Sequence, residues 1–203
     1  RIVIDGGATG LVLGVGDDGR LHQLAFGGPS AVAADQAFPT LIYPLAYPTF
    51  GEEPLREPAL RVTHGDGVTS TRLRVVDVVS RGPGAGTGRG RSSTTTVRMT
   101  DRISPLTVDL NVRAWPDHHL IEQWVEVTNG GVDPVELHRV AGSAPAFAGT
   151  SPHLTHWGGG WAGEWTETTE ALTPGVKTLA SAGGVRSALY RAPVVLFHPD
   201  GPA

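Results

Sequence analysis

Hydrophobic and polar residues alternate along several stretches of the chain with the two-residue period of a β-strand. In the clearest stretch, four aliphatic residues are each separated by one polar residue: Leu106, Val108, Leu110 and Val112. Successive side chains of a strand point to opposite faces, so this pattern predicts a strand with one buried face. Similar patterns predict strands over residues 71–81, 94–100, 120–129 and 135–140.

A β-hairpin is predicted close to the N-terminus. Apolar residues alternate with small ones over residues 11–15, and apolar residues recur over residues 21–26. Between them, residues 17–20 read Asp-Asp-Gly-Arg, and Asp and Gly favour tight turns. Two short strands joined by such a turn indicate an antiparallel pair.

The stretches between the predicted strands indicate loops. Residues 40–60 contain four prolines, which exclude a helix and a central strand and predict an extended, ordered loop. Residues 82–93, GPGAGTGRGRSS, could resemble a phosphate loop, but a strand-like sequence follows them where a phosphate loop needs a helix. A connecting loop is therefore favoured. The best helical candidate is the short stretch SAVAADQAF, residues 30–38.

About a dozen short strands with little helix predict an all-β fold of two packed, largely antiparallel sheets. The 28 glycines and 16 prolines lie between the predicted strands without low-complexity repeats, as turns in such a fold require. No shift in composition marks an internal boundary, so residues 1–203 are expected to form a single β-sandwich domain.

The composition excludes several functional classes. A formal net charge of −4 does not attract a polyanion, so no nucleic-acid partner is expected. The chain has no cysteine, which excludes disulfides and thiolate zinc sites. No run reaches the roughly 18 apolar residues of a membrane span, so no membrane partner is expected. The first residues, RIVIDGGATG, lack a signal peptide and a starting Met; we expect missing leading sequence and a cytoplasmic location.

Two histidine pairs are candidate metal ligands. His118 and His119 are adjacent, and His153 and His156 are three residues apart. In an extended chain both spacings point the two side chains to opposite faces, so neither pair chelates from a strand. We therefore expect no metal site and no cofactor.

The local sequence shows no pair of carboxylates at the separation that a glycosidase needs for its two catalytic groups. A retaining glycosidase holds two carboxyl groups roughly 5 Å apart. Glu122 and Glu126 share one face of a predicted strand, but four residues of strand separate them by about 13 Å. Local motifs therefore indicate no catalytic residue in this chain.

Three of the five tryptophans lie in the stretch WGGGWAGEWTE, at Trp157, Trp161 and Trp165. On an extended strand Trp161 and Trp165 share one face, with Gly163 between them. Two interpretations stay open: a surface on which sugar rings stack, or packing in the core or against a partner. Packing is favoured because a Trp side chain buries so much apolar area.

Three segments, in this order, resemble the N-terminal domain of glycoside hydrolase family 36 α-galactosidases (melibiases). AYPTFGEEPLREPAL, residues 46–60, resembles that domain's YPxxGxGDFRxPA segment. Residues 94–140 contain TNGGVDPVELHR, similar to its TNxGxxPVxLxR pattern. WGGGWAGEWTE is similar to its LxGxWAxE strand, and the resemblance covers nearly the whole chain.

The resemblance implies a β-supersandwich of the galactose-mutarotase type that precedes a catalytic (β/α)8 barrel. Family members remove terminal α-galactosyl residues from oligosaccharides with retention, using two barrel aspartates and no metal. No segment here resembles the family's nucleophile strand, so the chain alone is expected to be an inactive, incomplete scaffold and interface domain. The implied partners are the catalytic barrel of the same polypeptide, a homo-oligomer, and a galactose-containing oligosaccharide bound through the full-length enzyme.

The resemblance also implies a site assignment. The proline-rich loop of the family lies near the barrel mouth, so Arg56 and Glu53 are expected to be close to substrate. Pro54 and Leu55 stand where family members have Asp-Phe, which departs from the pattern. The resemblance further places Trp161 and Trp165 within the sandwich as packing residues.

Two other functions stay open. A stand-alone carbohydrate-binding module would need an exposed Trp124 or Trp157, with Trp161 and Trp165 also pointing outward. A mutarotase-like aldose epimerase would need a histidine facing a glutamate across a cleft. The candidates for such a pair are His118, His119 or His153 with Glu122 or Glu164.

Overall fold

A computed structural model describes residues 1–29, 43–52, 56–82, 91–147, 149–181 and 191–201. The chain divides into two compact units, Arg1–Ala146 and Phe147–Ala203, and no described sheet includes strands of both units. The expectation of one domain over residues 1–203 stays a prediction. The helical candidate at residues 30–38 and most of the glycine-rich loop lie outside the described residues. No helix among the described residues is long and apolar enough to cross a membrane.

A three-stranded antiparallel sheet opens the first unit. It consists of β1 (Ile2–Asp5), β2 (Gly10–Val15) and β3 (Leu21–Gly27), in that order. The turn between β2 and β3 is closed by a hydrogen bond from the Gly16 amide to the Arg20 carbonyl oxygen, and Gly19 adopts a φ of +79°. The predicted hairpin is therefore confirmed.

A four-stranded antiparallel sheet forms the second layer of this unit. Its strands pair in sequence order: β5 (Leu73–Arg81), β6 (Ser93–Asp101), β7 (Leu106–Trp115) and β8 (Leu120–Asn129). Each agrees with a strand predicted from alternation. The turn from β7 to β8 is a short 3₁₀ helix, η1 (Pro116–His118), which ends at His119 in the left-handed conformation.

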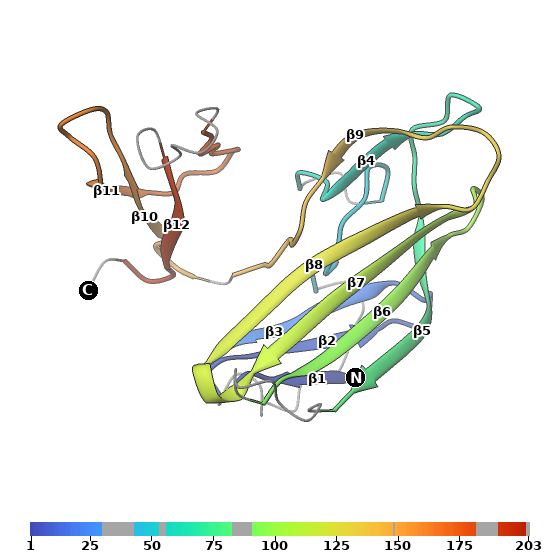
Figure 1. Ribbon diagram of the computed structural model, residues 1–203, viewed down its shortest axis with the longest axis horizontal. Coiled ribbons are helices and arrows are strands. Elements are labelled where there is room, and N and C mark those ends of the chain that lie inside the picture. Colours follow the sequence, from blue (N-terminus) through green and yellow to red (C-terminus); the bar gives the residue numbers. More distant parts are fainter. Residues whose placement is uncertain (30–42, 53–55, 83–90, 148, 182–190, 202–203) are drawn as a thin grey trace. The chain divides into compact units, whose positions relative to one another are not determined.

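The core lies between these two sheets (Figure 1). The four aliphatic residues of β7 predicted to face inward are each at most 2% exposed. They pack against apolar side chains from the other sheet, including Ile4, Leu11 and Leu13. The predicted alternation on β7 is therefore confirmed, and burial of these side chains supplies the main stabilisation of this unit.

A third, smaller sheet pairs β4 (Leu60–Thr63) with β9 (Glu136–Val140). The strand predicted over residues 135–140 is β9, but no local pattern indicates that β4 is its partner. Leu60 and Val62 are fully buried, while β9 is exposed along its length.

The second unit contains one antiparallel sheet, in the order β11-β10-β12. Its strands are β10 (His153–Gly158), β11 (Thr166–Ala171) and β12 (Arg191–His198). Together the sheets of both units make the described chain an all-β protein with largely antiparallel pairing, as predicted.

Candidate functional site

The middle of the tryptophan-rich stretch, residues 159–165, forms the turn of a hairpin. β10 ends at Gly158 opposite Thr166, the first residue of β11, so residues 159–165 make the connection. Gly159, Ala162 and Trp165 have positive φ values of 145°, 63° and 60°. The prediction that residues 161–165 are extended is therefore wrong. Its glycines permit a tight turn, and strand geometry resumes only where threonines follow.

The turn exposes two of its tryptophans. Trp161 is 91% exposed and Trp165 is 55% exposed, whereas Trp157 is half-buried within β10. Neither Trp161 nor Trp165 is therefore buried within the second unit. Packing against a partner and stacking on a sugar both stay predictions.

The proline-rich segment is the predicted neighbour of substrate. Arg56 donates a hydrogen bond from Nη1 to the carbonyl oxygen of Leu45 at 3.2 Å, which ties the segment back on itself. Glu53, with Pro54 and Leu55, lies outside the described residues. The substrate-proximal role of Arg56 and Glu53 stays a prediction.

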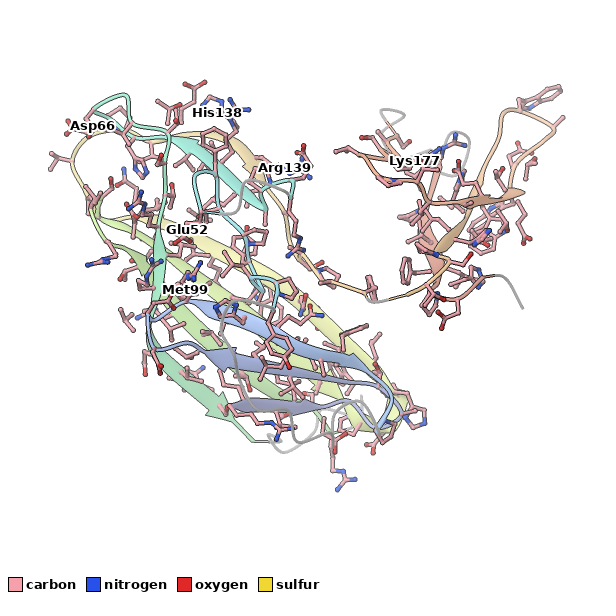
Figure 2. All side chains as sticks on the ribbon, turned by 180° about the vertical axis from the view of Figure 1, so that it is seen from behind. Glu52, Asp66, Met99, His138, Arg139 and Lys177 are labelled. Atoms are coloured by element: carbon pink, nitrogen blue, oxygen red, sulfur yellow. The ribbon has the colours of Figure 1, made fainter. Side chains whose placement is uncertain are left out.

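Glu52, beside the predicted residue, has a structural role that the local sequence does not indicate (Figure 2). Its side chain is 6% exposed and forms an ion pair with Arg74 of β5. The Thr49 hydroxyl is shared between two acceptors, the Glu52 carboxylate and the carbonyl oxygen of Thr71. A buried carboxylate needs such partners, so Glu52 fixes the proline-rich segment on the sandwich.

The outer side of the four-stranded sheet carries a hollow of about 310 Å³. We call this surface the polar face; it includes Asp77, Thr96, Arg98, Asp109, Asn111 and Glu126. Cross-strand register brings these residues together, since Arg98 lies opposite both Asp77 and Asp109, and Asp109 lies opposite Glu126.

The groups of the polar face bind one another. Arg98 donates from Nε and Nη2 to the two carboxylate oxygens of Asp109, at 2.8 and 2.7 Å. This carboxylate raises the pKa of the Arg98 guanidinium. Asn111 accepts from Thr96 at 2.7 Å and donates to Glu126 at 3.3 Å. Such a network can offer hydrogen bonds to hydroxyl groups, but it presents no acid paired with a base.

Two tryptophans flank an arginine next to this network. The Arg113 guanidinium carbon lies 4.9 Å from the ring centroid of Trp124 and 5.9 Å from that of Trp115. Trp124 is half-buried, and its indole nitrogen donates to Glu126 at 3.4 Å. A carbohydrate-binding module would need an exposed Trp124, and here the Trp124 ring is only partly exposed.

The histidines named for an epimerase have other partners. His119 accepts a hydrogen bond at Nδ1 from the Ala8 amide, 2.9 Å away, and so anchors the turn between β1 and β2. His153 donates from Nδ1 to the carbonyl oxygen of Ser151 at 2.8 Å. Glu122 accepts from Arg113, and Glu164 accepts from the Ala162 amide. The structure thus gives His119 and His153 structural partners.

A histidine–glutamate pair that the local sequence does not indicate lies in the second unit. His156 of β10 is 3% exposed, and its Nε2 is 2.9 Å from Glu170 of β11. Lys177 and then His156 lower the pKa of the Glu170 carboxyl. The two side chains meet because His156 and Glu170 lie diagonally across the paired strands. This contact could have been predicted only from the strand register. In the described parts of the chain, no group of three or more His, Cys, Asp or Glu side chains could hold a metal ion.

Comparison with family models matches residues 19–201 to the glycosyl hydrolase family 36 N-terminal domain. Two curated fungal relatives are described as probable alpha-galactosidase G of Aspergillus terreus and alpha-galactosidase C of Emericella nidulans. Each is 26% identical over 162 residues, which cover 76% of this chain and 22% of the relative. The chain therefore spans about a fifth of the length of these relatives.

Solved structures with the same fold include the alpha-galactosidase from Lactobacillus brevis, with a TM-score of 0.84 and 18% identity. The match covers 98% of this chain and 30% of that one. A family 36 alpha-galactosidase from Geobacillus stearothermophilus gives a TM-score of 0.83 at 20% identity, over 96% of this chain and 31% of that one. At these identities the likeness shows the fold of the chain.

Proposed function

The chain belongs to the glycosyl hydrolase family 36 N-terminal domain family, and we propose that it is the non-catalytic β-sandwich of an α-galactosidase. In this role it packs on a catalytic domain of the same polypeptide and helps to build subunit interfaces. The whole enzyme would release terminal α-galactosyl residues from oligosaccharides.

The extent of the match carries this proposal. The family match covers residues 19–201, yet the aligned region is only 22% of the curated relatives and about 30% of the solved structures. Most of each relative therefore lies outside the part that resembles this chain. These proportions support a protein in which a further domain of the same polypeptide carries the catalytic residues.

The chemistry of the described residues agrees with a scaffold. The buried carboxylate of Glu52 is neutralised by Arg74, and Asp109 accepts hydrogen bonds from two nitrogens of Arg98, Nε and Nη2. A general acid needs a carboxyl group that can reach substrate and change its protonation state, and a carboxylate nucleophile needs an oxygen that can reach the substrate. These carboxylates instead support the fold.

The proposal is tested by comparing the activity of the 203-residue chain with the activity of a longer polypeptide that continues beyond it. Hydrolysis of p-nitrophenyl α-galactoside should be absent with the chain and present with the longer polypeptide. Adding the purified chain to an inactive barrel-only polypeptide should restore stability of the barrel or its activity. Turnover by the chain alone would overturn the proposal, as would an inactive longer polypeptide.

A second candidate function has one observation in its favour. Trp161 and Trp165 are exposed on a turn, and Trp165 keeps a left-handed φ of 60°, which costs energy for a bulky residue. Exposed aromatic rings bind sugars by stacking on their apolar faces, so this turn could make the chain a carbohydrate-binding module.

Isothermal titration with galactose and raffinose separates the two candidates. A scaffold gives no heat of binding, whereas a binding module gives a saturable heat that Trp161→Ala abolishes. Trp124→Ala is the matched control, because Trp124 is half-buried beside Arg113 and lies in the other unit. Binding that survives Trp161→Ala but is lost in Trp124→Ala would place the sugar on the polar face.

A further inference from the structure

A second hollow of about 310 Å³ lies in the first unit, where three loops meet. We call it the loop cavity. It is lined by the turn that follows β4 (residues 64–66), the segment before β7 (residues 103–105), the start of β7, and the loop from β8 to β9 (residues 129–135). It shares no lining residue with the polar face or with the tryptophan-rich turn, and it has no role in the function proposed above.

The walls of the loop cavity are fixed by hydrogen bonds and close packing. The Gly130 amide donates to the carbonyl oxygen of Pro105 at 2.7 Å, and the Asn129 side chain donates to the carbonyl oxygen of Asp133 at 2.8 Å. A Cβ placed on Gly65 would lie only 2.4 Å from Cβ of Asp133. The loops are therefore held against one another, and the cavity is a built feature of the fold.

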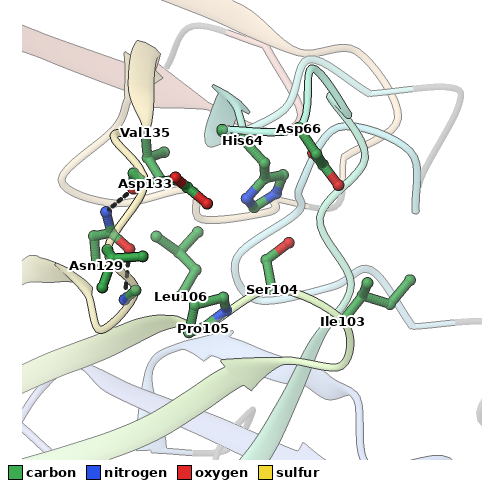
Figure 3. Close-up of a pocket in the computed structure, with 12 residues that line it drawn as sticks. His64, Asp66, Ile103, Ser104, Pro105, Leu106, Asn129, Asp133 and Val135 are labelled. Carbon is green, nitrogen blue, oxygen red and sulfur yellow. Dashed lines mark hydrogen bonds between the residues drawn. The ribbon is translucent and has the colours of Figure 1, made fainter.

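His64 and Leu106 are the two buried residues that line the loop cavity. Figure 3 shows the His64 imidazole between Asp66 and Asp133, above Ser104. The residue is 4% exposed, and its Nε2 lies 3.1 Å from the hydroxyl oxygen of Thr71. Its Nδ1 is buried and has no hydrogen-bond partner among the described residues. An unsatisfied buried nitrogen costs stability. When Nε2 carries the ring proton and donates to Thr71, Nδ1 is an acceptor, and a donor placed beside the ring would relieve that cost.

The charge of the loop cavity is negative. Asp66 and Asp133 both line it, and no Lys or Arg does so among the described residues. Asp66 accepts a hydrogen bond from the Val68 amide, and in the described residues neither carboxylate takes part in an ion pair. Two uncompensated carboxylates in one hollow attract a cation and repel an anion.

The rim of the loop cavity is apolar. Ile103 is 80% exposed and Val132 is 100% exposed, and both contribute to the lining. Contact of these apolar side chains with water is unfavourable. A ligand with an apolar part therefore binds more favourably when it covers them. A bare metal ion would leave them exposed, and the described residues hold no group of metal ligands.

We propose that the loop cavity binds an arginine side chain of a partner polypeptide. The planar guanidinium carries five N–H donors, which can serve Asp66, Asp133 and the unsatisfied nitrogen of His64. Its aliphatic stem and the neighbouring residues of the partner cover Ile103 and Val132. A free small cation would satisfy the carboxylates but would leave this rim exposed, and for that reason the proposal assigns the guanidinium to a polypeptide.

Chemical-shift titration of the ¹⁵N-labelled chain tests the charge requirement. N-acetyl-arginine amide should give saturable shifts of amides in residues 64–66, 103–106 and 129–135. N-acetyl-citrulline amide, which is neutral and nearly the same shape, should give none. The double change Asp66→Asn and Asp133→Asn keeps the side-chain oxygens and should weaken binding at least about fivefold. Asp17→Asn, on an exposed turn elsewhere, is the matched control and should bind as the unmodified chain does.

A short peptide tests the source of the guanidinium. A tripeptide amide with arginine between two leucines should bind more tightly than N-acetyl-arginine amide. Ile103→Ser with Val132→Ser should remove that gain and leave the affinity for N-acetyl-arginine amide unchanged. Equal affinity for peptide and free amide in the unmodified chain would overturn the polypeptide assignment. Equal binding of citrulline and arginine amides, no saturable shift, or full binding by the double Asn variant would overturn the site itself.

Discussion

Tyr47 donates a hydrogen bond from its phenolic oxygen to the carbonyl oxygen of Ala141, 2.9 Å away in space and 94 positions away along the chain. The side chain is 3% exposed and belongs to the proline-rich segment. This one bond therefore ties an irregular segment to the residue that follows β9. It also provides the most direct test of how that segment is held.

Replacing Tyr47 with Phe removes this bond and leaves the carbonyl oxygen of Ala141 without its donor. We expect the free energy of unfolding to fall by about 1–2 kcal/mol, because the ring still packs while the polar partner is lost. Urea denaturation followed by circular dichroism measures the change. An unchanged midpoint would show that the bond is absent in solution.

Burial also raises the pKa of Tyr47 to about 12. The ordinary value in an unfolded chain is about 10, so the folded state holds this proton more tightly. The stabilisation is fully present below pH 10 and is lost as the pH rises towards 12, by about 2–3 kcal/mol in all. Unfolding free energies measured between pH 9 and 12 should fall more steeply for the unmodified chain than for Tyr47→Phe. Parallel slopes would contradict this prediction.

Leu110 on β7 is 2% exposed and faces the core between the two sheets. Leu110→Ala should lower the free energy of unfolding by about 2–5 kcal/mol, through lost burial and the cavity left behind. Leu120, on the neighbouring strand β8, is 52% exposed and is the matched control. Its change to Ala should cost less than about 1 kcal/mol, as is usual for surface positions. Equal losses at the two positions would mean that this face of β7 is not buried against the other sheet.

Gly7 has a φ of +83°, and a Cβ there would lie 2.5 Å from Nδ1 of His119 and from the Pro116 carbonyl oxygen. Gly7→Ala should cost more than about 2 kcal/mol, since the clash adds to the backbone strain. Gly67 has a similar φ of +85° with open space around it. Gly67→Ala should therefore cost only the strain, roughly 1 kcal/mol. Thermal melts of both variants measure the difference, and a reversed order would be inconsistent with the contact between this turn and η1.

Trp161 is almost wholly exposed within its unit. Trp161→Ala should change the free energy of unfolding of the 203-residue chain by no more than about 0.5 kcal/mol. If a partner covers this ring in a longer polypeptide, the same substitution should destabilise that polypeptide markedly more. Differential scanning calorimetry of the two forms makes the comparison, and a large loss in the short chain alone would mean that the ring is buried after all.

Elements with strict alternation could be predicted from the sequence, because the pattern itself records which face is buried. β7 is the clearest case, and its inward residues are all in the core. The tryptophan turn could not be predicted in the same way. Glycine permits both extended and left-handed conformations, so the sequence around Trp161 is compatible with either a strand or a turn.

Contacts between distant segments were also beyond local patterns. The sequence near Glu52 does not indicate its ion pair with Arg74. The sequence near His64 does not indicate that Asp133 lines the same cavity. Such neighbours are set by strand register and by the way the loops of the sandwich meet. The family resemblance predicted the fold. The residue pairs at the candidate sites could be identified only from the three-dimensional structure.

The pairing of β4 with β9 has a consequence for how the protein is made. Thr63 and His138, whose side chains form a hydrogen bond across this small sheet, are 75 residues apart, and β5 to β8 lie between them. During synthesis β4 leaves the ribosome long before its partner exists, and an unpaired strand with buried positions such as Leu60 and Val62 is prone to aggregate. The nascent chain therefore passes through an interval in which β4 has no partner strand, and slower translation would lengthen that interval.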